Sequence, residues 1–233
     1  MPTSELPLSD IAGDVLRIHR LVTRALRVSV EESAVYAREG YPDESHRRGL
    51  VAYVRCLATL LHAHHITEDE SVFPYLRQVL PDAPYEALTA QHHAMDPILD
   101  RIRAALEGVA DSDQAGPALE ALHHSLEQMN ALWHAHIAQE EAHVSAERIG
   151  VVVDDAEQAQ MSVVFAREGR RHQMGLVPLY WLLPFLLYNL EGQDRQWMLN
   201  QMPSPRLSWI VTGVLLPWIW RKRWEPMAPF LLD

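Results

Sequence analysis

The sequence is poor in cysteine, in lysine and in long apolar segments. Its 233 residues include one cysteine, Cys56, which excludes an intramolecular disulfide framework and any zinc site made of four thiolates. The first ten residues, MPTSELPLSD, contain neither a basic segment nor an apolar core, so the sequence predicts no secretory signal and a cytoplasmic protein. Lysine occurs once against 19 arginines, which we interpret as genome composition rather than function.

Positive charge is scarce in the first two thirds of the chain. Residues 1–160 carry 12 arginines and no lysine against 26 acidic residues, a net charge of −14. Because such an acidic body repels phosphate, nucleic acid is excluded as a partner. Residues 161–233 carry eight basic residues against five acidic ones and hold six of the seven tryptophans. This change of composition predicts two parts, residues 1–150 and residues 151–233.

Four long helices are predicted within the first part. Capping residues, prolines and the spacing of apolar residues place them at about 10–38, 43–74, 85–109 and 117–149. Ser9-Asp10 caps the first helix, Pro74 interrupts the second, and Pro117 fits the first turn of the fourth after a loop at 111–116. Short loops between long helices favour antiparallel neighbours, so we expect an all-α fold, an up-down four-helix bundle with a C-terminal helical extension.

Each predicted helix places a histidine on its apolar stripe. The stripe of the second helix, Leu50, Val54, Leu57 and Leu61, continues to His64 and then Glu68. The stripe of the fourth helix, Leu119, Leu122, Leu126, Met129 and Trp133, continues to His136 and then Glu140. His19 and His92 occupy the missing positions in the stripes of the first and third helices. A bundle would therefore bring four histidines and two glutamates together in its centre.

This set of residues favours a metal centre. A single histidine on an apolar stripe is usually a hydrogen-bonded core residue, but four imidazoles and two carboxylates are costly to bury unless something compensates them. His64 with Glu68, and His136 with Glu140, are spaced four residues apart, so each pair can reach one metal or bridge two. Four histidines and two glutamates exceed the ligands of one zinc ion. Two six-coordinate ions offer about twelve positions, of which these ligands and a bridging oxygen fill about ten. The arithmetic points to redox-active iron with open positions for a small molecule.

The same residues resemble a known family. The stretch His64-His65-Ile66-Thr67-Glu68-Asp69, followed by Val72-Phe73-Pro74, is similar to the HHxxEE…LFP signature of the hemerythrin-like (HHE cation-binding) family. His136-Ile137-Ala138-Gln139-Glu140-Glu141 resembles the second HxxxEE motif, and Gln91-His92 and Ile18-His19-Arg20-Leu21 resemble the stretches around the single histidines of the third and first helices. The resemblance covers about residues 10–150. It implies a non-heme, oxo- or hydroxo-bridged di-iron centre with these ligands: His19, His64, Glu68, His92, His136 and Glu140.

The sequence departs from the family pattern at three points. Asp69 replaces the second glutamate of the first motif, and the fourth helix lacks a phenylalanine-proline tail. Classical oxygen-carrying hemerythrins have a second histidine one turn before the third-helix ligand, where this chain has Leu88. One fewer ligand leaves the site more open and favours reaction over reversible oxygen carriage, although His65 or another side chain could fill the gap.

The remaining histidines are interpreted one by one. His93 points away from the seam, so His92 is preferred as the ligand. His65 lies beside the seam and is spaced to pair with Asp69, either behind the ligands or on the helix surface. His143 follows Glu140 on the core stripe and is a supporting group or, less favoured, a ligand. Four more are interpreted as solvated or flanking: His62, His123, His124 and His134. Cys56 is expected in the core rather than as a nucleophile.

The second part of the chain leaves two interpretations open. Asp154-Asp155 caps a helix to about Glu168, and a further helix opens at 191–195 and ends at Pro203. Residues 172–190 and 207–220 carry no formal charge, and Arg221-Lys222-Arg223 follows. Either these runs contact a membrane, or they are short helices that cover the bundle or another subunit. Prolines at 178 and 184 and the shortness of the second run favour the second interpretation. The extension could therefore form a homodimer contact or a peripheral membrane contact.

Three functions are compatible with the sequence. The first is an oxygen-reactive di-iron protein that binds dioxygen, peroxide or nitric oxide and, as an oxidase or oxygenase, acts on a small molecule. The second is a non-catalytic oxygen or iron sensor or store. The third is a membrane-peripheral structural protein in which the metal only stabilises the bundle.

Overall fold

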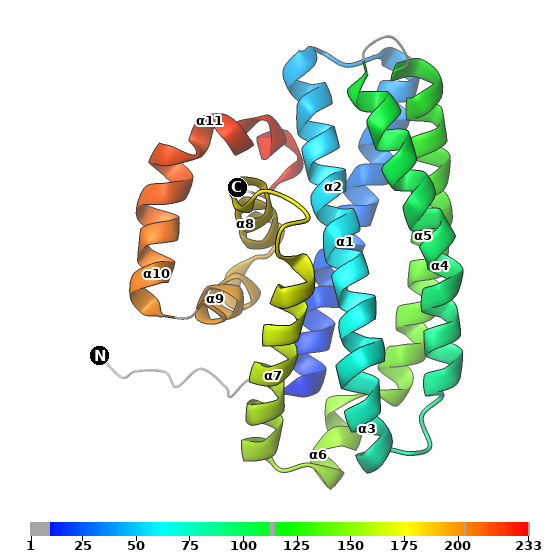
Figure 1. The fold of residues 1–233 in the computed structure, drawn as a ribbon, viewed down its shortest axis with the longest axis vertical. Coiled ribbons are helices and arrows are strands. Elements are labelled where there is room, and N and C mark those ends of the chain that lie inside the picture. Colours follow the sequence, from blue (N-terminus) through cyan, green and yellow to red (C-terminus); the bar gives the residue numbers. More distant parts are fainter. Residues whose placement is uncertain (1–9, 112–114, 203, 233) are drawn as a thin grey trace.

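Four long helices packed side by side form the body of the molecule (Figure 1). The computed structural model describes residues 10–111, 115–202 and 204–232, and no β-strand occurs among them. The four helices are α1 (Ile11–Glu39), α2 (Glu44–Thr67), α4 (Tyr85–Ala110) and α5 (Ala115–His143). Helix α4 packs against α5 and α2, and α1 packs against the same two helices, which closes a four-helix bundle. The predicted all-α fold and bundle are confirmed.

The helix ends follow the capping signals in the sequence. The Asp10 side chain accepts a hydrogen bond from the Gly13 N–H at 2.7 Å, and α1 begins there. The Asp43 side chain accepts one from the His46 N–H at 3.0 Å at the start of α2. Between them, Gly40 ends α1 with φ at 77°, a left-handed conformation that favours glycine. Ser9, the other predicted cap, lies outside the described residues.

The second helix does not stop at Pro74. Helix α2 runs through a π turn, η1 (Glu68–Val72), directly into α3 (Phe73–Val79). The prediction that Pro74 interrupts the helix is therefore wrong. In the π turn the Phe73 N–H donates to the Glu68 carbonyl, and Pro74 lies in the first turn of α3. The missing N–H of a proline costs least at such a position, so the chain stays helical through it.

The fourth helix is shorter at its end than predicted. Helix α5 stops at His143, and α6 (Ala146–Val152) begins as a separate helix, so the prediction of one helix to about residue 149 is wrong. The Ser145 hydroxyl accepts a hydrogen bond from the Arg148 N–H at 3.3 Å, which caps the new helix. At the other end α5 already includes Ala115 and Gly116, while residues 112–114 of the predicted loop lie outside the described residues.

The extension lies against one flank of the bundle (Figure 1). Its elements are α7 (Asp155–Gln173), α8 (Leu179–Tyr188), α9 (Gly192–Asn200), α10 (Pro205–Ile210), the π helix η3 (Val211–Ile219), α11 (Arg221–Trp224) and the 3₁₀ helix η4 (Glu225–Phe230). Asp154 caps α7 as predicted, but the helix continues past Glu168 to Gln173. Among the residues that the structure describes, no helix is both long enough and apolar enough to cross a membrane.

One hydrophobic core runs from the bundle into the extension. Helices α7 and η4 both pack on α2. Phe185 of α8 and Phe230 of η4 place their rings 5.1 and 5.6 Å from the ring of Tyr53 on α2. Beside them, the Tyr53 hydroxyl donates to Asn189 at 2.7 Å, and the Arg24 guanidinium donates to Asn189 and to the carbonyl of Phe230. These contacts fix the extension to the bundle on the side of α1 and α2.

Candidate metal centre

All six predicted ligands meet in one buried cluster between the four long helices. His19 comes from α1, His64 from α2, His92 from α4, and His136 with Glu140 from α5. Glu68 is the first residue of the π turn that continues α2. Every one of these side chains is at most 7% exposed. The apolar residues of the predicted stripes, which precede the cluster residues in α2 and α5, are buried as well. This confirms the helix faces from which the cluster was predicted.

The potential ligand atoms fall into two groups. His19, His64, Glu68 and Glu140 form one group and His65, His92 and His136 the other, and within each group the ligand atoms lie within 4.8 Å of one another.

Each carboxylate lies between the two groups. Glu68 approaches His64 Nδ1 through Oε1 at 3.3 Å and His92 Nε2 through Oε2 at 3.4 Å. Glu140 Oε2 is 3.2 Å from His19 Nε2 and 3.3 Å from His136 Nε2. Both carboxylates therefore occupy positions from which they can bridge two cations.

Three of the histidines are oriented by an oxygen atom on their outer side. The Nδ1–H of His19 donates to Glu141 at 2.8 Å and that of His92 donates to Asp69 at 3.0 Å. The Nδ1–H of His136 donates to the side-chain oxygen of Gln91 at 3.0 Å. Each bond leaves Nε2 of the neutral ring with a lone pair directed at the cluster, which is how metal-binding histidines are usually held.

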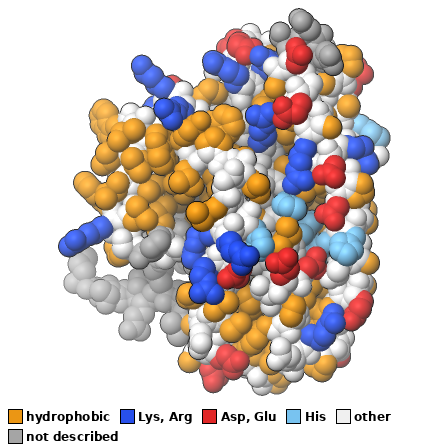
Figure 2. Space-filling view, in the orientation of Figure 1, with side chains coloured by type: hydrophobic (Ala, Val, Ile, Leu, Met, Phe, Trp, Pro, Cys, Tyr) orange, Lys and Arg blue, Asp and Glu red, His pale blue; other side chains and the backbone are white. Residues whose placement is uncertain are grey.

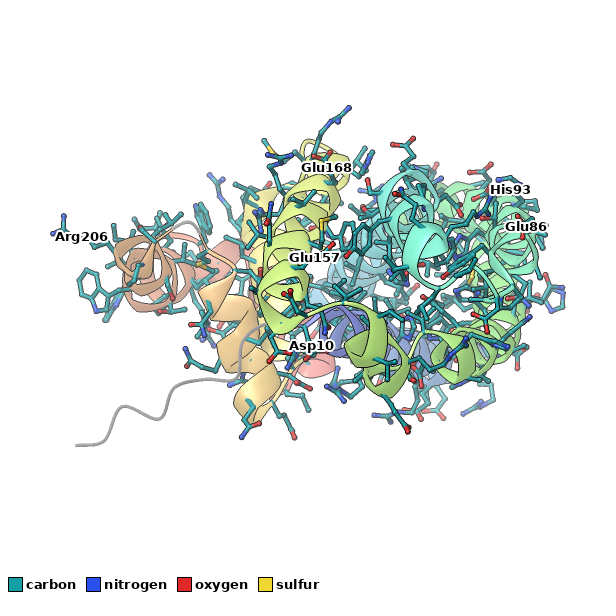
Figure 3. The ribbon with its side chains drawn as sticks, turned by 90° about the horizontal axis from the view of Figure 1, so that it is seen from below. Asp10, Glu86, His93, Glu157, Glu168 and Arg206 are labelled. Carbon is teal, nitrogen blue, oxygen red and sulfur yellow. The ribbon has the colours of Figure 1, made fainter. Side chains whose placement is uncertain are left out.

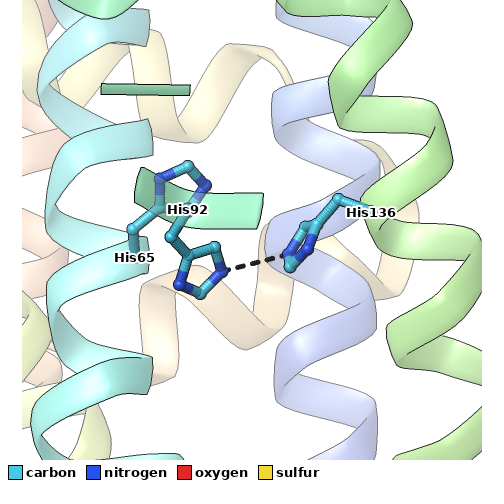
Figure 4. A group of neighbouring side chains, drawn as sticks. All are labelled: His65, His92 and His136. Atoms are coloured by element: carbon cyan, nitrogen blue, oxygen red, sulfur yellow. Dashed lines mark hydrogen bonds between the residues drawn. The ribbon is translucent and has the colours of Figure 1, made fainter. Parts of the chain in front are cut away.

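Two inner ring nitrogens of the cluster, both acceptors in this tautomer, lie within hydrogen-bond distance of each other. Nε2 of His92 and Nε2 of His136 face each other at 3.2 Å (dashed line in Figure 4), although both rings already donate through Nδ1. A hydrogen bond between these atoms needs an additional proton, whereas a cation between them uses both lone pairs.

Further buried atoms have no hydrogen-bond partner within the described part of the chain. They are His19 Nε2, His64 Nε2, both ring nitrogens of His65, and both oxygens of Glu68 and of Glu140. Since buried polar atoms in folded proteins are nearly always paired, these residues fit a bound metal.

The charges of the metal-free cluster oppose one another. Burial raises the pKa of Glu68 to about 8, and the charge of Glu140 adds to the effect. Burial acts the same way on Glu140, but the imidazoles of His19 and His136 hold its pKa well below the usual range. Burial lowers the pKa of His19, yet Glu140 and Glu141 outweigh it and raise that pKa to about 10. Two adjacent carboxylates thus require positive charge, which protons supply here and which a metal cation supplies equally well.

Aromatic rings close the cluster on two sides. Trp133 of α5 is fully buried, and its ring lies 5.3 Å from that of His19 and 5.7 Å from that of His64. Its indole N–H donates to Thr23 at 2.9 Å, which fixes the ring in place. On the other side Phe73 stacks on His92 with the ring centres 5.7 Å apart. These walls exclude water and keep the ligand atoms in an apolar surrounding.

A small open cavity at the surface lies beside one residue of the cluster, His19. It has a volume of about 290 Å³ and is lined by His19, Arg20, Thr23, Arg24, Arg27, Ile137 and Glu141. Arg20 and Arg24 are held by the extension, through Asp194 and Asn189 respectively. The lining of the cavity thus combines three arginines and one carboxylate with a buried histidine of the cluster.

Most of the other histidines lie where the sequence predicts. His93 is exposed on the outer face of α4, as Figure 3 shows, and His124 and His134 are exposed on α5. His123 bonds to Ser33 of α1 at 3.1 Å, and His62 is half-buried. His143 belongs to neither group of ligand atoms and bonds the carbonyl of Gln139 in its own helix at 2.8 Å. Cys56 is fully buried, which confirms its predicted place in the core.

His65 and the outer oxygens were not fully predicted from the sequence. The spacing pairs His65 with Asp69, but Asp69 bonds His92 and Thr89 instead, and His65 is buried inside the cluster. Glu141 and Gln91 had no predicted role. Both are direct neighbours of predicted ligands in the sequence, and Glu141 is the second acid of the HxxxEE motif, which was the available signal.

The fold and the site define a class: a helical bundle whose buried histidines and carboxylates could hold a metal cation. The family model described as the hemerythrin HHE cation-binding domain matches residues 13–147. The chain belongs to the hemerythrin HHE cation-binding domain family, as its motifs indicated. No curated protein and no solved structure shows a significant match to it.

Proposed function

We propose that this protein holds a dinuclear non-heme iron centre and binds or activates dioxygen, peroxide or nitric oxide there. The observation that carries the proposal is the position of the two carboxylates, since Glu68 and Glu140 each contact one histidine of either group. A mononuclear site needs three or four protein ligands and would leave the others buried without partners.

Iron supplies redox capacity and coordination positions for a small ligand when it is bound. The residues of the chain provide the rest of the function. Glu141, Asp69 and Gln91 keep three histidines in the metal-binding tautomer, and Trp133 and Phe73 exclude water. The cavity beside His19 gives a small molecule access, and its three arginines favour an anionic one.

Iron loading under anaerobic conditions tests the proposal. We expect about two iron ions per chain and a change in the optical spectrum when oxygen is added to the reduced protein. His64→Ala and Glu140→Ala should each abolish stoichiometric loading, because each removes a buried ligand. His93→Ala is the matched control, since His93 lies next to a predicted ligand but on the exposed face of α4.

The same preparation separates an enzyme from a binding protein. Consumption of oxygen or peroxide over many turnovers supports an oxidase or a peroxide-consuming activity. A stable adduct that forms once per centre supports a non-catalytic sensor or store. Failure of the wild-type protein to bind about two iron ions would contradict the dinuclear centre in either role.

A further inference from the structure

His65 is a buried imidazole that forms no hydrogen bond through its ring in the described part of the structure. It is 4% exposed, and among the described residues neither of its ring nitrogens has a hydrogen-bond partner. A histidine kept in a core for structural reasons normally donates at least one hydrogen bond. His65 therefore differs from His143, which is half-buried and bonds a backbone carbonyl of its own helix.

The position of His65 places it among the potential ligands. Its ring stacks on that of His92 with centres 4.1 Å apart and an angle of 14°, and it meets the ring of His136 at 5.9 Å. Figure 4 shows the three side chains converging from α2, α4 and α5. The ligand atoms of the three lie within 4.8 Å of one another.

The surroundings of His92 explain why His65, and not another side chain, lies beside the rings of His92 and His136. Leu88, one turn before His92, is fully buried in a separate apolar cluster with Phe73 and Tyr85 and supplies no donor atom. Asp69 is engaged by His92 and Thr89, so it does not bond to His65. The imidazole that lies nearest to His92 and His136 as a third potential nitrogen donor therefore comes from α2.

We propose that His65 is a seventh protein ligand and completes a three-histidine set with His92 and His136. This inference depends on the proposed dinuclear centre. The other group keeps two histidines, His19 and His64, and the number of coordination positions left for external ligands falls from about two to about one.

Metal binding by His65 variants tests this role separately from the centre itself. In His65→Ala we expect one of the two iron ions to bind at least about tenfold more weakly than in the wild type, as measured by competition with a chelator. Added imidazole should restore its binding, because it can replace a missing ligand but not a missing packing contact. His93→Ala should bind both ions normally. Unchanged affinity for both ions in His65→Ala would overturn the role of His65 while leaving the dinuclear centre intact.

A second measurement uses the unmodified protein and does not depend on a variant that folds. In the cobalt-substituted wild type, the solvent-exchangeable imidazole N–H signals shifted by the metal can be counted by NMR. Five such signals are expected if His65 coordinates, and four would overturn the proposal. A wild type that binds no metal at all would instead refute the proposed function.

The outermost part of the extension carries an independent feature, an exposed apolar surface. It consists of Leu207, Trp209 and Ile210 of α10 with Trp218 and Ile219 of η3, and we call it the α10–η3 surface. Trp209 is 68% exposed and Trp218 is 80% exposed. Figure 1 places α10 and the segment that follows it on the side of the molecule away from the bundle, and hydrophobic side chains gather on that side in Figure 2.

Positive charge lies at both ends of this surface. Arg206 is exposed at the start of α10, at the extremity of the molecule in Figure 3, and Arg221, Lys222 and Arg223 are exposed just beyond η3. Residues 204–224 contain no aspartate or glutamate, and Glu225, which follows them, lies 3.3 Å from Arg221. The rest of the chain is strongly acidic, with 26 acidic residues against 12 arginines in residues 1–160. The surface is therefore complementary to a negatively charged partner.

An anionic lipid surface matches this combination best. Exposed tryptophans insert at the level of the lipid headgroups, and arginine and lysine beside them attract anionic lipids. A symmetric contact between two copies of the α10–η3 surface would place like charges against each other. We infer that the protein docks on anionic membranes through this surface, with Trp209, Trp218 and Ile219 entering the interface.

Vesicle binding by the full iron-loaded chain tests the inference. We expect co-sedimentation with vesicles of phosphatidylcholine and phosphatidylglycerol, and much weaker binding to phosphatidylcholine alone. Trp209→Ser with Trp218→Ser should abolish binding, while Val163→Ser, another exposed apolar residue on α7, should not change it. Changing Arg221, Lys222 and Arg223 to Gln should weaken binding by about fivefold per charge at low salt.

Two results would overturn the membrane inference. One is the absence of binding to either kind of vesicle. The other is a protein that does not bind vesicles but forms a dimer in light scattering, with Trp218→Ser dissociating the dimer. In that case a second copy of the chain covers the surface.

Discussion

At the scale of single residues, Asp69 supports the metal centre without belonging to its inner set. Its two oxygens accept hydrogen bonds from His92 at 3.0 Å and from Thr89 at 2.6 Å. Burial alone would raise the pKa of Asp69, but these two hydrogen bonds outweigh burial and hold the pKa below its usual range. Asp69→Asn keeps the shape but removes the charge that fixes His92. Metal affinity should fall by about 10- to 100-fold, measured by competition with a chelator. Asp96→Asn, on the exposed face of the same helix as His92, is the matched control and should leave affinity unchanged.

The single cysteine reports on the integrity of the core. Cys56 is fully buried on α2, and burial raises the pKa of its thiol far above the usual range. We expect no reaction with a disulfide reagent such as DTNB at neutral pH in the native protein and complete reaction of one thiol per chain in denaturant. Rapid modification of the native protein would show that α2 opens around this position without global unfolding.

At the scale of helices, we expect small ligands to approach the metal centre through the cavity between α1 and α5. Ile137 of α5 lines the cavity beside His19, and its neighbour Ala138 points to solvent. Ile137→Trp should fill the cavity and slow the binding of azide to the iron-loaded protein by about tenfold, which corresponds to about 1.4 kcal/mol of added barrier. Ala138→Trp adds the same ring outside the cavity and should have no effect. Equal rates in all three proteins would show that small ligands enter elsewhere.

The contact between α2 and η4 depends on one glycine. A Cβ atom at Gly49 would overlap the carbonyl of Pro226 and would lie 2.9 Å from the ring of Phe230. Gly49→Ala should therefore destabilise the protein by about 1–3 kcal/mol, measured by denaturant unfolding. Gly150→Ala in α6, where nothing lies within 4 Å of the new atom, should be neutral or stabilise by up to about 1 kcal/mol. Two variants of equal stability would contradict the close packing of η4.

The helices could be predicted from the sequence because their signals are local. Asp10, Asp43 and Gly40 cap helix ends through contacts within a few residues, and the apolar spacing alone placed six side chains on the correct helix faces. The failures involve competition between local signals. Pro74 indicates a helix end unless the π turn before it is known, and the Ser145 cap lies within an apolar pattern that continues past it.

The position of His65 depends on tertiary structure and could not be predicted in the same way. Its spacing allows a bond to Asp69 on the same helix, and only the approach of α4 gives Asp69 better partners in His92 and Thr89. The folding of the extension onto α2 is equally non-local. Tyr53 contacts Asn189 and Phe230 although both are far from it in the sequence. No periodic pattern in the bundle or in the extension predicts these contacts.

At the scale of the whole molecule, the bundle and the extension differ in charge but share one hydrophobic core. Phe185, Met227 and Phe230 of the extension are each at most 2% exposed and belong to the same apolar cluster as Tyr53 and Leu57 of the bundle. The division at residues 150–160 therefore separates surfaces of different charge rather than separate hydrophobic cores. We expect the described residues of both parts to unfold together.

Calorimetry of the full chain and of a shortened chain tests this expectation. The full chain should show one transition, with a calorimetric enthalpy equal to the van't Hoff enthalpy. A chain ending at residue 153 exposes the surface of α2 that Phe185, Met227 and Phe230 cover, and each of these side chains contributes about 1.5–3 kcal/mol through burial. Since a whole domain is stable by only about 5–15 kcal/mol, the shortened chain should lose cooperative unfolding near room temperature. Trp218→Ser, which changes an exposed residue outside the core, should keep the single transition of the full chain. Two separate transitions in the full chain, or an unchanged melting temperature after shortening, would show that the bundle is stable without its extension.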